Sequence, residues 1–155
     1  MPSGVYVSGP TFSFMGWIYL PVTPAHIIEI FLIGNGAGSD NIYFNLNNFA
    51  FGGCIYNGTN SFCLAGVCGT FYMTKTWMHM AYTFDGTNFT FYVNGILCTS
   101  SVSTVLPRTI TRSVNYICDD YWTPIGNFSV IFIDDFRIYN RAVNPSEIAY
   151  IMTLS

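Results

Sequence analysis

Charged side chains are scarce in this sequence. Asp, Glu, Lys and Arg make up 8% of its 155 residues, against about 25% in a typical soluble domain. The five Lys and Arg residues are scattered along the chain. No basic cluster could neutralise a row of phosphates, which argues against nucleic-acid binding. Polar cover must come from Ser, Thr, Asn and Tyr, or part of the surface must be hidden by glycans or a partner.

Long apolar runs are missing as well. The best candidate, residues 27–33, contains Glu29 and falls far short of the ~18 residues of a membrane span, so it predicts a buried strand. The first residues, MPSG, lack the basic and apolar stretches of a signal peptide. Five cysteines, few lysines and three Asn-x-Ser/Thr sequons are nevertheless typical of a secreted protein. We therefore expect an extracellular or cell-surface location, and a mature fragment or a domain of a longer precursor.

Catalytic patterns are also absent. Glycoside hydrolysis needs two carboxylates that flank the scissile bond. The only glutamates are Glu29, which is alone in an apolar strand, and Glu147, which suits helix capping. The histidines, His26 and His79, have no serine or cysteine nucleophile in a recognisable context, and no Gly-rich phosphate loop is found. The sequence predicts a protein that is not an enzyme.

Alternating aromatic and β-branched residues dominate what the sequence does contain, and turn residues separate the runs. Strands are expected over residues 11–20, 27–33, 41–47, 49–56, 61–67, 77–84, 89–93, 96–99, 129–133 and 136–139. Residues 100–123 are polar and are expected to form an irregular excursion.

One helix is predicted near the end of the chain. Asn144 can cap it, Pro145 suits its first position and Glu147 its third, ahead of residues 148–152. Many short strands and one terminal helix predict an all-β sandwich or jelly roll, in a single domain over residues 1–155.

Three segments together resemble a known family pattern. Residues 12–18, FSFMGWI, are similar to the FTISAWV strand of laminin-G-like, concanavalin A-like jelly rolls. Residues 77–86, WMHMAYTFDG, with residues 89–95 resemble their WHHVAVTYDG…LYVDG hairpin. Residues 133–142, IDDFRIYNRA, followed by PSEI at 145–148, resemble their closing IDDVRIYNRALSAEEI. The resemblance implies a two-sheet antiparallel jelly-roll sandwich with one short C-terminal helix, and a non-catalytic binding or assembly module.

The family pattern usually opens with a further strand beside the closing strand. Only residues 1–11 precede Phe12, so this strand is expected to be short or missing, with residues 5–7 as a remnant. The edge of the closing strand, residues 133–140, would then be unpaired. A strand from another chain could fill it, and residues 5–7 of the next subunit are the candidate. Alternatively, an upstream strand of the precursor supplies the missing neighbour.

An outward face of aromatic and apolar side chains supports two functions. The predicted assembly surface consists of Met15, Trp17, Tyr19, Ile133, Arg137 and Tyr139. The first hypothesis is a structural or adhesive subunit that forms a homo-oligomer or filament in an extracellular fibre or matrix. The alternative is a lectin-like module that binds glycans, because surface aromatic residues also form glycan platforms.

Five cysteines allow 15 ways to form two disulfides with one thiol left over. The intervening hairpin turn sets Cys54 opposite Cys63, close enough to bridge. Cys98 and Cys118 bracket the irregular segment and are predicted to pair, which leaves Cys68 free or intermolecular. A one-residue bulge would instead offer Cys68 to Cys54.

The three sequons begin at Asn57, Asn88 and Asn127. Asn57 heads a hairpin turn, Asn88 should face outward and Asn127 lies in a loop, so all three are expected to be accessible and glycosylated. Asn88 is the strongest of the three.

No pattern in the sequence requires a cofactor. The resemblance implies that Ca²⁺ is a candidate ligand at the rim, where Asp40, Asp119 and Asp120 supply loop carboxylates. Loop aspartates are more often simply solvated. Cys98 and Cys118 are too far apart, and too poorly supported by histidine, to indicate a zinc site.

Overall fold

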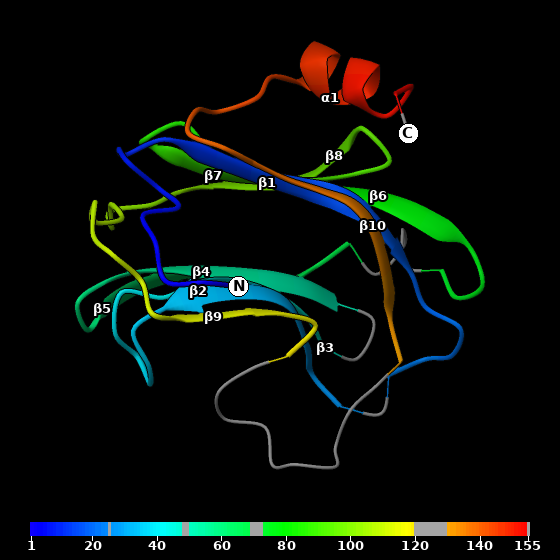
Figure 1. Cartoon of the computed structure of the whole chain (residues 1–155). Coiled ribbons are helices and arrows are strands. Elements are labelled where there is room, and N and C mark those ends of the chain that lie inside the picture. The colour runs from blue at the N-terminus through cyan, green and yellow to red at the C-terminus, as the bar shows by residue number, and fades with distance from the viewer. Residues whose placement is uncertain (25, 48–49, 69–72, 120–129, 155) are drawn as a thin grey trace.

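Two antiparallel sheets of five strands pack face to face in the computed structural model (Figure 1), as the sequence predicts. The structure describes residues 1–24, 26–47, 50–68, 73–119 and 130–154. The first sheet has the strand order β10-β1-β6-β7-β8 and comprises β1 (Phe12–Tyr19), β6 (Trp77–Phe84), β7 (Asn88–Val93), β8 (Ile96–Val102) and β10 (Phe132–Tyr139). The second has the order β5-β4-β3-β2-β9 and comprises β2 (Ile28–Gly34), β3 (Ile42–Asn47), β4 (Ala50–Asn57), β5 (Asn60–Val67) and β9 (Val114–Ile117). Within the described ranges, no helix is long and apolar enough to span a bilayer.

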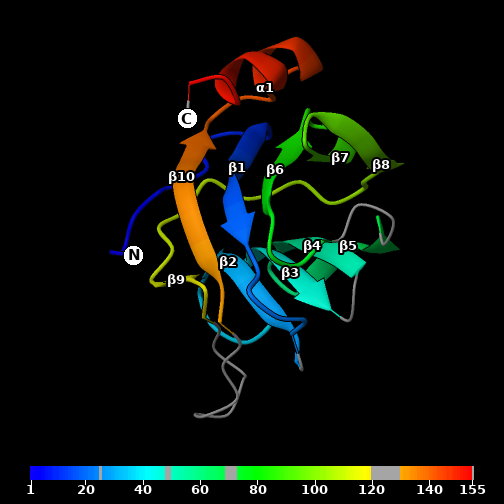
Figure 2. The same ribbon diagram turned by 90° about the vertical axis from the view of Figure 1, so that its right-hand side faces the viewer.

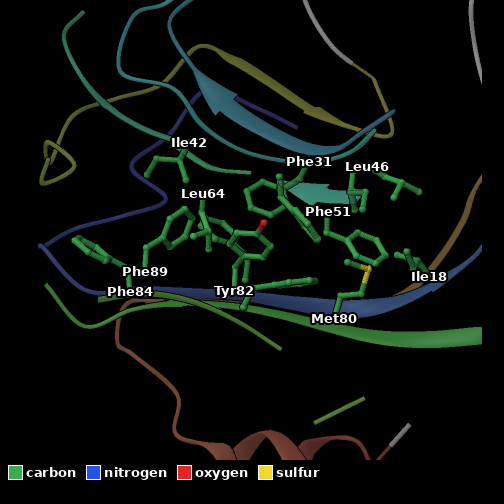
Figure 3. Close-up of a cluster of buried hydrophobic side chains, with 14 of the residues drawn as sticks. Ile18, Phe31, Ile42, Leu46, Phe51, Leu64, Met80, Tyr82, Phe84 and Phe89 are labelled. Carbon is green, nitrogen blue, oxygen red and sulfur yellow. The ribbon is translucent and has the colours of Figure 1, made fainter. Parts of the chain in front are cut away.

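The core lies between the two sheets and is rich in aromatic rings (Figure 3). Phe14 of the first sheet stacks on Phe31 of the second, with ring centroids 4.2 Å apart. Phe44 and Tyr82 also meet across the two sheets, with centroids 4.1 Å apart and ring planes tilted by 46°. Each fully buried ring of this kind contributes roughly 1.5–3 kcal/mol, so the inward-facing residues of the alternating strands are a main source of the attraction between the two layers.

The C-terminal helix α1 (Pro145–Ile151) covers part of the outer face of the first sheet (Figure 2). The predicted capping box is present: Asn144 accepts a hydrogen bond from the backbone N–H of Glu147, whose side chain accepts from the backbone of Asn144. Ile148 packs in a buried cluster with Met15, which is 3% exposed. Met15 points outward as predicted, but its assignment to an assembly surface is wrong, because the protein's own helix covers it.

Residues 1–11 form no strand and make only an isolated bridge, between Gly4 and Arg112. The segment leads from β9 to the end of β10: the amino group of Met1 donates to the Asn115 carbonyl, and the Ser8 N–H donates to the Asn140 side chain. Val7 is fully buried in the core. The prediction that residues 5–7 reach another subunit is therefore wrong, because this segment is anchored within its own fold.

Two predictions about strands differ from the structure. The segment 100–123 contains β9, which the sequence missed because its four residues are too few to establish a period. The two short segments predicted at residues 129–133 and 136–139 correspond to one strand, β10, interrupted by a bulge opposite Gly16; residue 129 lies outside the described residues. A Cβ atom on Gly16 would lie 3.2 Å from the Asp134 carbonyl oxygen, so glycine lets the bulge approach β1.

The disulfides confirm one predicted pair and correct the other. Cys54 and Cys63 are directly paired across β4 and β5 and form a disulfide, as predicted. The second disulfide joins Cys68 to Cys98, and Cys118 is the free thiol. The predicted Cys98–Cys118 pair is wrong because β8, which holds Cys98, ends one sheet at the edge nearest β5, whereas Cys118 follows β9 at the other edge. The Cys68–Cys98 bond links the two sheets.

Candidate binding site on the outer sheet face

Three aromatic side chains lie side by side on the outer face of the first sheet, beyond the area covered by α1. Tyr19 of β1 is directly paired with Trp77 of β6 and with Phe132 of β10. Its ring centroid lies 5.6 Å from that of Trp77 and 5.9 Å from that of Phe132. Trp77 is 43% exposed and Phe132 is 53% exposed. We call Trp77, Tyr19 and Phe132 the aromatic row.

The next pair along the same strands is Trp17 and His79, whose rings meet edge to face at 5.3 Å. His79 is buried, and desolvation lowers its pKa to about 4, while Asp135 opposes this shift and Arg137 adds to it. The Nε1 atom of Trp17 and the Nδ1 atom of His79 are buried and have no hydrogen-bond partner among the described residues. The buried imidazole is therefore uncharged at neutral pH.

An ion pair between two residues of β10 lies on the same sheet. Arg137 is directly paired with Met15, so its side chain lies on the outer face. Its Nε atom donates to the two carboxylate oxygens of Asp135 at 2.8 and 2.9 Å, and Nη2 lies 2.7 Å from Oδ2. Asp135 has a positive φ of 49° at the bulge. The bulge thus places a carboxylate and a guanidinium next to the Trp17–His79 pair.

The structure brings together four of the six residues predicted for the assembly surface. These four side chains lie on the outer face, because each residue is paired with an outward-facing residue of the neighbouring strand; they are Trp17, Tyr19, Arg137 and Tyr139. Ile133 instead packs against the core, since it pairs with the inward-facing Ile18. Its assignment to that surface is corrected.

Sequence reasoning missed two members of the row, Trp77 and Phe132. The signal for Trp77 was present: Met78 and Met80 are core residues, so the alternation of β6 turns Trp77 outward. The outward orientation of Phe132 was harder to predict from the sequence, because the bulge shifts the pairing of β10 with β1.

The two glutamates do not form a hydrolytic pair. Glu29 is buried in β2 of the second sheet, where Nδ2 of Asn45 donates to it at 3.4 Å. Glu147 belongs to α1, on the outside of the first sheet, and pairs with Arg141. The two carboxylates lie in different layers of the molecule and cannot flank one bond.

The two sequon asparagines that the structure describes differ in their surroundings. Asn57 is exposed, and its Nδ2 atom donates to the Leu106 carbonyl at 3.0 Å. Asn88 is half-buried, and its Nδ2 atom donates to Asp85 at 3.0 Å. Asn127 lies outside the described residues.

Asp40 does not fit the role of a calcium ligand. It is 2% exposed, and its carboxylate accepts from Nε of Arg108 at 2.6 Å, from Nη2 of Arg108, and from the Gly58 N–H at 2.7 Å. This pairing holds the pKa of Asp40 below its usual value. Asp119 is half-buried and Asp120 lies outside the described residues. Among the residues described, no three His, Cys, Asp or Glu side chains gather to hold a metal ion.

The chain is similar in sequence to one protein family over nearly its whole length. The model of the Concanavalin A-like lectin/glucanases superfamily matches residues 2–149. No curated protein sequence matches the chain.

Several solved structures with a similar fold are binding domains of botulinum neurotoxins. The binding domain of botulinum neurotoxin serotype G has a TM-score of 0.71 at 16% identity, over 96% of this chain and 37% of that one. The receptor-binding domain of mosaic serotype C/D gives 0.71 at 15% identity, over 96% and 37%. A structure of botulinum neurotoxin type C, whose route into cells depends on interaction with two ganglioside molecules, gives 0.65 at 16%, over 94% and 36%. The present chain thus spans little more than a third of each.

Proposed function

The chain belongs to the Concanavalin A-like lectin/glucanases superfamily, and from this premise we propose that it is a non-catalytic binding module that holds glycans on its outer sheet face. The observation that carries this proposal is the aromatic row, three neighbouring rings of which Trp77 and Phe132 are about half exposed. Exposed apolar patches of this kind mark interaction sites in soluble proteins.

The chemistry of the face suits a sugar. The C–H faces of a pyranose ring are apolar and can lie flat on an aromatic ring, while its hydroxyl groups need donors and acceptors close by. Trp and Tyr combine a large apolar body with a polar tip, and the Asp135–Arg137 pair supplies charged hydrogen-bonding groups on the neighbouring strand. The ganglioside dependence of the toxin with a similar fold is consistent with this ligand class.

The same proposal places the protein outside the cell or on its surface. Two disulfides within one small domain are stable in an oxidising compartment. Glycans at Asn57, Asn88 and Asn127 would add the polar cover that a chain with 8% charged residues lacks.

Self-association is the second candidate, and a separate observation favours it. Among the described strands, β10 pairs only with β1, so its other edge has no strand beside it. An open edge can accept a strand of a second copy, and a head-to-tail contact of this kind forms a homo-oligomer or a filament. Phe132 on the same strand would add apolar area to such a contact.

A glycan array probed with the full chain tests the proposal, with and without Ca²⁺. We expect binding to a defined set of glycans, and Trp77→Ala should weaken it about tenfold or more, as truncating a Trp hot spot does. Ile96→Ala is the matched control, because Ile96 is 55% exposed on β8, away from the row. Equal loss with both variants, or no binding to any glycan, would refute the proposal. Size-exclusion chromatography with light scattering tests self-association on the same samples.

A further inference from the structure

A polar groove lies at the end of the sandwich opposite the aromatic row. The β4–β5 hairpin forms one wall with Asn57, Asn60 and Ser61, and residues 104–106, which follow β8, form the other. The hairpin belongs to the second sheet, whereas residues 104–106 follow β8 of the first sheet (Figure 1). We propose that this groove is a second binding site, which takes a neutral, hydroxyl-rich ligand such as a monosaccharide by hydrogen bonding.

A buried carboxylate holds the hairpin wall in place. Asp40 accepts from the Gly58 N–H in the hairpin turn at 2.7 Å, and its own N–H donates to the Gly58 carbonyl at 3.1 Å. Arg108, two residues after the other wall, donates to the same carboxylate. Arg112, which is fully buried, donates to the Asp40 and Arg108 carbonyls at 2.9 and 3.2 Å. The Asp40 carboxylate therefore connects both walls, and their relative position is set before any ligand binds.

The two walls also contact each other directly, because Nδ2 of Asn57 donates a hydrogen bond to the Leu106 carbonyl. The side chains of Asn60, Ser61 and Thr104 are exposed and make no hydrogen bond to another described residue. The groove thus offers one amide and two hydroxyl groups on a preorganised frame, and these groups are free to bind a ligand.

The lining selects the class of ligand. The groove has a volume of about 430 Å³, within the ~300–1,000 Å³ of small-molecule sites. None of the described residues that line it is charged. Asp40 and Arg108, behind the wall, pair with each other. Among the described lining residues an anion would find no cation, and Val105 and Leu106 alone offer apolar contact. Adjacent hydroxyl groups of a sugar match amide and hydroxyl partners, which both donate and accept.

The site goes beyond the aromatic row, because it uses other residues at the other end of the domain. It also has a consequence for Asn57: a glycan attached to its Nδ2 atom would occupy the groove that Asn57 lines. The ligand-free groove is therefore available only in chains that carry no glycan at Asn57.

The test is a titration of the full-length, oxidised and unglycosylated chain with glucose, galactose, mannose and N-acetylglucosamine, followed by the backbone amide resonances. We expect saturable shifts at Asn60, Ser61 and Thr104 for at least one sugar, and binding about tenfold weaker in Ser61→Ala/Thr104→Val, which removes two hydrogen-bonding groups. Both residues are exposed, so the unchanged remainder of the spectrum verifies the fold.

Trp77→Ala separates this site from the aromatic row, since it should leave the groove titration unchanged even if glycan-array binding is lost. Shifts that vanish in Trp77→Ala, equal shifts with inorganic phosphate, or no shift with any of the four sugars would each overturn the proposal.

Discussion

The indole of Trp17 and the imidazole of His79 meet edge to face on directly paired positions of β1 and β6, with ring centroids 5.3 Å apart. His79 is buried in this contact, and its desolvation lowers the pKa of the imidazole to about 4. Since a histidine in an unfolded chain has a pKa of about 6.5, the folded protein binds this proton less readily than the unfolded chain does.

Stability should therefore fall with acidification, between pH values of about 6.5 and 4. The contribution of His79 is fully present above its unfolded pKa and is lost progressively as the pH falls toward the folded value, by a total of about 3 kcal/mol. Chemical denaturation of the wild type and of His79→Gln across this range measures it. The variant should lack this part of the slope, and parallel curves for the two proteins would contradict a buried neutral imidazole.

Gly53→Ala should destabilise the protein by about 1–3 kcal/mol, because the site is overpacked. An added Cβ atom would lie 2.6 Å from Cε1 of the fully buried Tyr82 and 2.9 Å from the Tyr43 carbonyl oxygen. Thermal unfolding measures the loss. Gly9→Ala is the control, since a Cβ atom there meets nothing within 4 Å, and an equal effect of the two substitutions would show that packing is not the cause.

The oxidised chain should contain the Cys68–Cys98 disulfide, and removing it by a double Ser substitution should cost about 3–4 kcal/mol in the chain-entropy picture. Non-reducing peptide mapping identifies the bond, and denaturation measures its contribution. Cys118→Ser should change stability far less. Burial raises the pKa of the Cys118 thiol to about 11, so it should react slowly with iodoacetamide at neutral pH. A peptide linking Cys98 to Cys118 would contradict this disulfide pattern.

Protein recovered from a glycosylating secretory pathway should carry N-glycans, and intact mass before and after enzymatic deglycosylation measures them. Asn57 is exposed, whereas Asn88 is half-buried and bonded to Asp85. The structure thus favours Asn57 over Asn88, and site occupancy from glycopeptides should follow this order. An unmodified mass would mean that the chain never enters such a compartment.

Local signals predicted most of the fold. The hairpin turn fixed the register that pairs Cys54 with Cys63, and the Asn144–Glu147 capping box was readable from four residues. Strand alternation also showed that Met15 faces outward, but not that α1 would cover it, because helix docking depends on the path of the chain after β10.

Long-range relationships explain the remaining errors. Cys118 is nearer to Cys98 in sequence than Cys68 is, yet Cys98 and Cys118 belong to opposite edges of the sandwich. Cys68 approaches Cys98 through the packing of one sheet on the other. The groove depends on Asp40, Arg108 and the β4–β5 turn, which are joined only in the folded chain. No spacing in the sequence indicates that these segments meet.

The Cys68–Cys98 bond joins the two sheets covalently at the edge of β5 and β8. At the opposite edge the N-terminal segment bridges from β9 to Asn140, the residue after β10, by hydrogen bonds and burial alone. Because the non-covalent contacts can break while the disulfide persists, we expect heat or tension to separate the sheets of the oxidised protein first along the edge of β9 and β10, with the edge of β5 and β8 still linked. In such a partly opened molecule the disulfide would still hold the two sheets near each other, which should favour refolding. The core would then become exposed to solvent from the side of β9 and β10.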